Sequence, residues 1–244
     1  MIGIGNSSIT GLYMGDAEVS AAYLGDTLVY TTGSSVITEI DGLEFRTVGG
    51  VSPRYVLGLT TQDVSKFEFV VMNRNVNDGT WPKGDGCILG NTTDDTDNTK
   101  MRVYFFKNSG TSTPAYRVRY CGVRTSGTNN ALETGLHVVK CVTSNLSVNT
   151  LFNTVVTDNA LGTQYADTTT TSKPTGVPGS DAIVLGNSDG RNEFDFYGLK
   201  FYDSSNNLIH EYVAALDGTT PCIYDKVTST AIHSSTAVDP DPIL

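Results

Sequence analysis

"FDFYGLKFYDSSNNLIHEYVAAL", residues 194–216, is the stretch of sequence that decides the fold. Its two halves, 194–203 and 208–216, are rich in aromatic and β-branched residues, which favour extended strands. The four residues between them, "SSNN", are turn formers that join the two runs within the length of a tight turn. The stretch therefore predicts an antiparallel β-hairpin.

Short β-rich runs of the same kind recur along the chain. No window of eleven or more residues carries the i, i+3, i+4, i+7 apolar stripe of an amphipathic helix. Five further runs have the length of a strand: 66–73, 100–108, 115–123, 136–142 and 181–187. The polar segments between them are expected to be loops: 74–86, 90–98, 124–130 and 167–180. Many short strands separated by polar loops predict an all-β fold, an antiparallel β-sandwich.

The composition is that of a folded chain with a sizeable core. Of the 244 residues, 39% are hydrophobic and 17% are charged, and nine Phe, twelve Tyr and one Trp are present. There is neither a long apolar run nor a basic leader before an apolar stretch, so no membrane insertion is expected. The net charge of −10 argues against nucleic acid as a partner, because a phosphate backbone is held by clustered Lys and Arg.

The charges are unevenly distributed. From Met1 to Phe45 there are six acidic residues and no basic one, whereas from Asn98 to Leu132 there are six basic residues and no acidic one. The two segments either lie on opposite sides of an assembly contact or are two solvated faces that differ.

The four cysteines show no metal-binding or redox motif. Cys87, Cys121, Cys141 and Cys222 form no C-x-x-C pair and have no histidine at zinc-ligand spacing. Buried free thiols are expected, with a disulfide as the alternative.

A ten-residue phrase is repeated near the start of the chain. Four residues of the first copy, Tyr13, Gly15, Asp16 and Val19, recur as Tyr23, Gly25, Asp26 and Val29. Tyr, Val, Thr and Leu alternate around the Gly-Asp turns, which predicts two small β-arcs. Because isolated hairpins are marginal in water, this segment needs the main sandwich or another subunit to pack on. We expect an N-terminal module at 1–32, followed by the sandwich at 33–244.

The segment 194–233 resembles the closing hairpin of concanavalin A-like, laminin-G-like jelly-roll domains. Such domains occur in virion proteins of tailed phages and in prophage regions of gut bacteria, of the Bacteroidetes type. The pattern there is a strand ending in "KIYD", a turn, a strand like "LIHDYVPALD" and then "PCLYDKVTGT". Residues 200–203, 208–217 and 221–228 match it closely, and the resemblance extends loosely over residues 36–233.

The opening repeat also resembles elements near the start of phage structural proteins. Together, the two resemblances imply a non-enzymatic structural protein of a tailed-phage virion, assembled in the host cytoplasm, either a capsid decoration or head fibre or a tail-associated protein. The N-terminal module would attach to other virion proteins. A homo-oligomer is expected, a trimer first, with the jelly roll displayed for assembly or for binding a host-surface glycan. The alternatives are a free carbohydrate-binding lectin of a gut bacterium and a degenerate jelly-roll glycoside hydrolase.

The segment "EFDFYG" (193–198) tests the hydrolase alternative. Jelly-roll glucanases carry E-x-D-x-E or E-x-D-x-x-E on one strand, and Glu193 and Asp195 match the first two acids. Tyr197 or Gly198 stands where the second Glu belongs, so the strand lacks half of a retaining pair. We expect Phe194 and its neighbour Phe196 to pack in the core, with Glu193 and Asp195 facing solvent or a partner.

Other motifs give only weak chemical signals. Asp94, Asp95 and Asp97 in "DDTDN" are a weak calcium candidate, although the EF-hand pattern is absent and a solvated acidic turn is favoured. No cofactor is otherwise expected. Trp81 lies in a loop and either stacks on a sugar or covers the core. His210 is expected to be a satisfied, partly buried residue, and no hydrolase, P-loop or dinucleotide motif is present.

Alternation predicts a cationic face on two neighbouring strands. In "AYRVRYC", Arg117 and Arg119 point to one side of the sheet, and Arg102 and Tyr104 alternate in the same way in the preceding strand. This face is a candidate for gripping an acidic subunit, such as the segment Met1 to Phe45, or an anionic glycan. Simple solvation of the face is the remaining alternative.

Overall fold

The computed structural model divides the chain into two compact units, Met1–Val36 and Ile37–Leu244. It describes residues 13–14, 17–18, 21–24, 27–31, 36–73, 87–91, 99–107, 114–121, 123–124, 136–144, 151–158, 163–170, 179–186 and 193–244. None of these residues is helical, so the described part of the chain contains no helix able to span a membrane. The unit boundary follows Val36, whereas the sequence placed it after residue 32.

The first unit contains one antiparallel strand pair for each copy of the repeated phrase. β1 (Tyr13–Met14) pairs with β2 (Ala17–Glu18), and β3 (Ala21–Leu24) pairs with β4 (Thr27–Thr31). The register is the same in both copies, because Tyr13 lies opposite Glu18 and Tyr23 lies opposite Leu28. Of the other repeat positions, Val29 lies in β4, whereas Gly15, Asp16, Val19, Gly25 and Asp26 lie outside the described residues.

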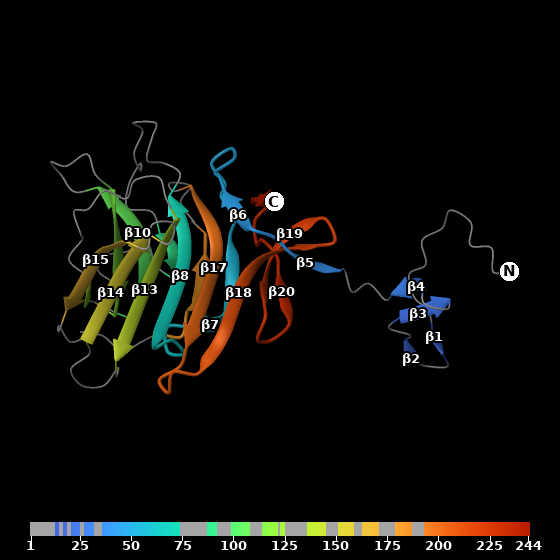
Figure 1. Ribbon diagram of the computed structural model, residues 1–244, viewed down its shortest axis with the longest axis horizontal. Helices are drawn as coiled ribbons and strands as arrows, with labels where there is room; N and C mark the ends of the chain where they lie inside the picture. Colours follow the sequence, from blue (N-terminus) through green and yellow to red (C-terminus); the bar gives the residue numbers. More distant parts are fainter. Residues whose placement is uncertain are drawn as a thin grey trace. The chain divides into compact units, whose positions relative to one another are not determined.

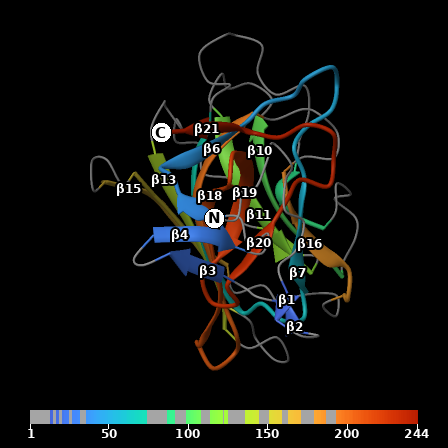
Figure 2. The ribbon, with the colours of Figure 1, turned by 90° about the vertical axis from the view of Figure 1, so that its right-hand side faces the viewer.

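The second unit is a two-sheet antiparallel sandwich, which confirms the predicted fold class (Figure 1). The larger sheet has the order β15-β14-β13-β8-β17-β18-β19-β20, to which β5, β6 and β21 attach, and the smaller sheet has the order β12-β11-β10-β9-β16-β7. Figure 2 shows the sandwich from the side. The strand bounds are β5 (Ile37–Glu39), β6 (Gly42–Phe45), β7 (Tyr55–Thr60), β8 (Lys66–Asn73), β9 (Cys87–Gly90), β10 (Met101–Lys107), β11 (Pro114–Tyr120), β12 (Val123–Arg124), β13 (Leu136–Ser144), β14 (Leu151–Asp158), β15 (Thr163–Thr170), β16 (Ala182–Leu185), β17 (Phe194–Tyr202), β18 (Leu208–Asp217), β19 (Thr220–Asp225), β20 (Thr230–Ile232) and β21 (Asp241–Ile243).

The hairpin predicted from residues 194–216 is formed by β17 and β18. The carboxylate of Asp203 organises its turn by accepting the N–H of Ser205 at 2.9 Å, the N–H of Asn207 at 2.8 Å and the amide of Asn207 at 2.9 Å. Hydrogen bonds from the side chain and backbone of Asn207 hold the pKa of Asp203 below its ordinary value. On its other edge β17 pairs with β8.

A β-bulge at Tyr197 changes which residues of β17 face the core. Phe196 lies opposite Val71 and Gly198 lies opposite Val70, so Tyr197 is an extra residue. Phe194 and Phe196 before the bulge, and Leu199 and Phe201 after it, therefore all point inward. These four side chains are at most 1% exposed, which confirms the predicted core role of Phe194 and Phe196.

The core lies between the inner faces of the two sheets. The larger sheet contributes aromatic side chains from β6, β8 and β17, and Phe45 stacks on Phe194 with ring centroids 4.5 Å apart. The smaller sheet contributes an inner row of apolar residues from β7, β16, β9, β10 and β11: Tyr55, Leu185, Leu89, Val103 and Val118.

Three of the four cysteines can be assigned as free thiols. Cys87, Cys121 and Cys222 are buried and unbridged, as expected. Burial raises the pKa of Cys222 to about 11, and the charge of Asp217 adds to the shift. The side chain of Cys141 lies outside the described residues.

Part of the loop prediction is wrong. Residues 167–170, expected at the start of a surface loop, are the second half of β15, where Thr170 lies opposite Phe152 of β14. Arg124, expected to begin a loop, lies in the short strand β12. Threonine is β-branched and favours a strand once a partner strand is available, which explains the first error.

Candidate functional site

The candidate site lies on the outer face of the smaller sheet, the face turned away from the core. The strand register places one row of residues across five strands of this face: Val56, Val184, Gly90, Arg102 and Arg119. The row is apolar on β7 and β16 and cationic on β10 and β11. Residues from opposite ends of the chain therefore meet on one surface.

The register confirms that the predicted cationic residues share a face. Arg102 lies opposite Arg119, and Tyr104 lies opposite Arg117. Two of them are nevertheless buried rather than open to a subunit, a glycan or solvent, because Arg102 is 2% exposed and Tyr104 is 0% exposed. The guanidinium carbon of Arg102 lies 4.0 Å from the centre of the Tyr104 ring, a cation–π contact that accompanies this burial. Arg119 is partly buried, and the side chain of Arg117 lies outside the described residues.

A pocket of about 480 Å³ opens beside this row. Val56, Gly90, Ala182 and Val184 line its middle. At Gly90, which has φ +144°, an added Cβ would lie 2.4 Å from the carbonyl oxygen of Met101. Glycine is therefore required at this position, and it leaves the pocket without a side chain there.

One end of the pocket is a rigid polar corner. The side-chain amide of Asn91 donates to Oγ1 of Thr61 and to the carbonyl of Asp181, each at 2.9 Å, and its oxygen accepts the N–H of Met101 at 3.0 Å. Nζ of Lys100 donates to Oδ2 of Asp181 at 2.9 Å. The Asp181 side chain is 61% exposed, so this corner presents a charged pair to solvent.

Arg54 and Gly186 line the other end of the pocket. The carbonyl of Arg54 accepts the N–H of Ser235 at 2.6 Å and its hydroxyl at 2.9 Å. The Arg54 backbone is thereby anchored to the C-terminal segment, while its half-buried side chain borders the pocket. Gly186 has φ +97°, and an added Cβ would lie 2.2 Å from the carbonyl oxygen of Pro53.

The acidic residues of "EFDFYG" lie elsewhere, and one of them contradicts its prediction. Asp195 is 0% exposed rather than facing solvent or a partner, and the register places Glu44 and Met72 beside it on the two neighbouring strands. Glu44 is itself 8% exposed and contacts Arg46. Sequence reasoning missed Glu44 as a neighbouring carboxylate because it is remote in the chain.

The remaining candidates lie outside the described residues. These are Trp81 and the acidic residues Asp94, Asp95 and Asp97. Among the residues that the structure describes, no group of three His, Cys, Asp or Glu side chains is arranged to hold a metal ion.

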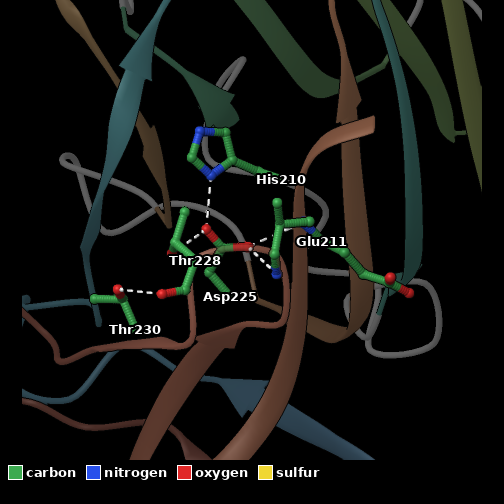
Figure 3. A network of polar contacts seen from close by, with 6 residues as sticks. His210, Glu211, Asp225, Thr228 and Thr230 are labelled. Atoms are coloured by element: carbon green, nitrogen blue, oxygen red, sulfur yellow. Dashed lines mark hydrogen bonds and ion pairs between the residues drawn. The ribbon is translucent and has the colours of Figure 1, made fainter. Parts of the chain in front are cut away.

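His210 is a satisfied, partly buried histidine, as expected, and it belongs to a network around Asp225 (Figure 3). Asp225 is 2% exposed and contacts Nδ1 of His210 at 2.7 Å. It also accepts the hydroxyl of Thr228 at 2.6 Å and the N–H groups of Glu211 and Val227 at 3.2 Å and 3.1 Å. Burial alone would raise the pKa of Asp225, but the hydrogen bonds from Thr228, His210 and the two N–H groups outweigh it and lower the pKa.

This network ties the turn after β19 to the start of β18. Asp225 is saturated with partners, so its role in the described structure is to hold the hairpin together. The sequence signal for it is an Asp followed by Thr three positions later at the end of a strand, which is typical of a side-chain-capped turn.

Comparison with known proteins gives only distant structural likenesses. Neither a protein-family model nor a curated protein matches the chain. Basic winged bean lectin, solved with Tn-antigen, is 15% identical, with 68% of this chain and 90% of that chain covered and a TM-score of 0.42. SCP-B, a member of the Eqolisin family of peptidases solved with the tripeptide Ala-Ile-His, is 11% identical, with 82% and 99% covered and a TM-score of 0.34.

Proposed function

We propose that this protein is a non-enzymatic structural and binding protein of a tailed-bacteriophage particle. Its N-terminal unit attaches to other particle proteins, and its sandwich is displayed. The observation that carries this proposal is the division of the chain after Val36 into two compact units, the first built from two copies of one strand pair. The proposal that the particle is a phage virion rests on the resemblance of the repeat and of residues 194–233 to phage virion proteins.

The N-terminal unit has the properties of an attachment element. Among the described residues, its two sheets, β1-β2 and β3-β4, have two strands each. Two-stranded pairs are marginal alone and gain stability when another chain adds strands or an apolar face. The same need favours a homo-oligomer, with a trimer as the first expectation.

The sandwich is suited to display because it contains its own core. All residues of the core cluster lie between Leu43 and Ile223. Asp195 is buried on the strand where jelly-roll glucanases carry their acids, which supports a binding role rather than hydrolysis. A free glycan-binding lectin is the second candidate function, and the pocket beside Val56 is the observation that favours it.

The attachment role is tested in the full-length protein with substitutions in both repeats. Tyr13→Ala combined with Tyr23→Ala removes the matched aromatic from each strand pair, and Tyr13→Phe with Tyr23→Phe is the control. We expect quantitative mass spectrometry of purified particles to find the wild type and the Phe control incorporated and the Ala variant depleted by about 10-fold or more, the loss that follows from about 1.4 kcal/mol of attachment energy. Unchanged incorporation of the Ala variant would refute the attachment role. Absence of the wild type from particles would refute the virion assignment and leave the lectin.

A further inference from the structure

We propose that the pocket on the outer face of the smaller sheet binds one or two sugar units of a glycan. The inference rests on the second candidate function, glycan binding, and names the ligand and the residues of its pocket. It is independent of the attachment role, because the residues that line the pocket lie between Arg54 and Gly186. Three features carry it: an apolar middle, polar groups at both ends, and a rigid frame.

The middle of the pocket matches the apolar face of a sugar ring. Val56 is 42% exposed there, beside Val184 on the neighbouring strand and Gly90 on the next. A pyranose ring presents its C–H groups as a flat apolar patch, which gains free energy by covering exposed valine. Gly90 and Ala182 leave this surface low enough for a ring to lie against the sheet.

The two ends of the pocket offer hydrogen-bonding groups to the rim of a sugar. At one end, a hydroxyl is able to donate to the exposed carboxylate of Asp181 while accepting from Lys100, whose Nζ lies 2.9 Å from Oδ2 of Asp181. At the other end, Arg54 supplies several N–H donors in a planar fork, suited to adjacent hydroxyls or to the carboxylate of an acidic sugar.

The dimensions fit a short saccharide. Asp181 and Gly186 flank β16 (Ala182–Leu185), and at about 3.3 Å per residue the extended chain from one to the other spans roughly 16 Å, enough for two linked rings. The volume of about 480 Å³ lies within the usual range for small-molecule sites.

The frame of the pocket is preorganised. Asn91 is locked by three hydrogen bonds, and Gly90 and Gly186 hold strand ends in conformations that other residues rarely adopt. A preformed site does not lose binding energy to ordering its own groups. This rigidity distinguishes the pocket from an accidental gap between side chains.

The test is glycan binding by the full-length protein. An array of neutral and uronic-acid-containing bacterial oligosaccharides identifies a bound sugar, and titration calorimetry with that sugar gives its Kd. Val56→Trp fills the middle of the pocket, and Val227→Trp, at a site 47% exposed on another hairpin, is the matched control. Asp181→Asn weakens the pair with Lys100, and Glu39→Gln weakens the exposed pair with Lys226 as its control.

We expect Val56→Trp to weaken binding by about 10-fold or more, an amount that corresponds to one lost apolar contact surface, and Asp181→Asn to weaken it several-fold. Both control variants should bind as the wild type does. If Val56→Trp lowers the melting temperature, Arg54→Met provides the second test, with loss of binding expected again. Binding that survives both Val56→Trp and Arg54→Met, or a wild type that binds no sugar on the array, overturns the inference.

Particle incorporation is measured on the same preparations. A wild-type protein that enters particles but binds no sugar overturns this inference and leaves the proposed function standing. One that binds sugar through the pocket but never enters particles overturns the virion assignment alone.

Discussion

At the scale of single residues, Ser229 stands out because its backbone is strained. Its φ is +56°, in the left-handed region where an L side chain is disfavoured, and the resembling phage pattern "KVTGT" has glycine at this position. We predict that Ser229→Gly stabilises the protein by about 0.5–1 kcal/mol, the strain relieved minus the extra entropy of an unfolded glycine. Urea denaturation measures the change. Ser205→Gly, in the turn after β17 at a residue whose own φ is not positive, should lower stability slightly, and equal effects of the two substitutions would show that φ is not the cause.

Substitution of Asp225 should destabilise the protein, because its hydrogen bonds favour the charged carboxylate and outweigh the cost of burying it. Asp225→Ala leaves the hydroxyl of Thr228 and two partly buried N–H groups without their acceptor, and we predict a loss of about 2–4 kcal/mol at pH 7. Glu39→Ala, which removes only an exposed ion pair, should cost less than about 1 kcal/mol.

The same residue gives a pH dependence whose sign follows from its pKa. Because the folded state lowers the pKa of Asp225, its stabilising effect is complete above the unfolded value of about 3.9 and is lost as the pH falls through the lower folded value. The stability difference between wild type and Asp225→Asn should therefore be largest near neutral pH and shrink below about pH 4, as measured by denaturation at several pH values. A difference that stays constant down to pH 2 would contradict the assignment.

At the scale of elements, the glycines that end β9 and β16 are expected to be irreplaceable. An added Cβ at Gly186 would lie 2.2 Å from the carbonyl oxygen of Pro53, on a backbone with φ +97°. We predict that Gly186→Ala destabilises the fold by about 2–4 kcal/mol, from the clash and the left-handed strain together. Gly58→Ala is the control, since nothing lies within 4 Å of its added Cβ, and it should change stability by less than about 0.5 kcal/mol. The denaturant midpoints of the two variants, compared with the wild type, measure these changes in stability.

The elements also show what sequence alone can and cannot predict. Alternating aromatic and β-branched residues were enough to place β8, β17 and β18 within a residue or so. The bulge at Tyr197 was not predicted, because inserting one residue leaves a run of large side chains that looks continuous. β14 and β15 were missed because they are rich in Thr, Asn and Asp, and their strand character comes from pairing with neighbours.

The candidate site was predicted from the sequence even less completely than the strands were. Alternation predicted correctly that Arg102 and Tyr104 share a face, but not that both are buried, since the period of a strand does not determine how far its side chains are exposed. The pocket was not predicted at all. Its residues come from β7, β9 and β16, which are far apart in the chain, and only the pairing register brings them together.

At the scale of the whole molecule, the two units differ in how their stability is supplied. The sandwich encloses its own core, whereas each of the two sheets described in the N-terminal unit has two strands. Under the proposed particle role, the sandwich would be folded before assembly and the N-terminal unit would gain stability on contact with its partner. The division after Val36 therefore predicts that the stability of the sandwich does not depend on the N-terminal unit.

Two truncations test whether the sandwich is stable without the N-terminal unit. Removing residues 1–36 deletes no strand of the sandwich, so we predict a melting temperature within about 2 °C of the full chain, a shift of less than about 0.5 kcal/mol for a domain of this size. Removing residues 1–41 also deletes β5, which pairs with Ala215–Asp217 of β18 and carries Glu39, the partner of Lys226. This second truncation leaves an edge of β18 without hydrogen bonds and should lower the melting temperature by several degrees, about 2–4 °C for each kcal/mol lost. Differential scanning calorimetry of the three chains compares them directly. A large drop already in the first truncation would mean that the sandwich depends on the N-terminal unit, and that the chain folds as one body rather than two.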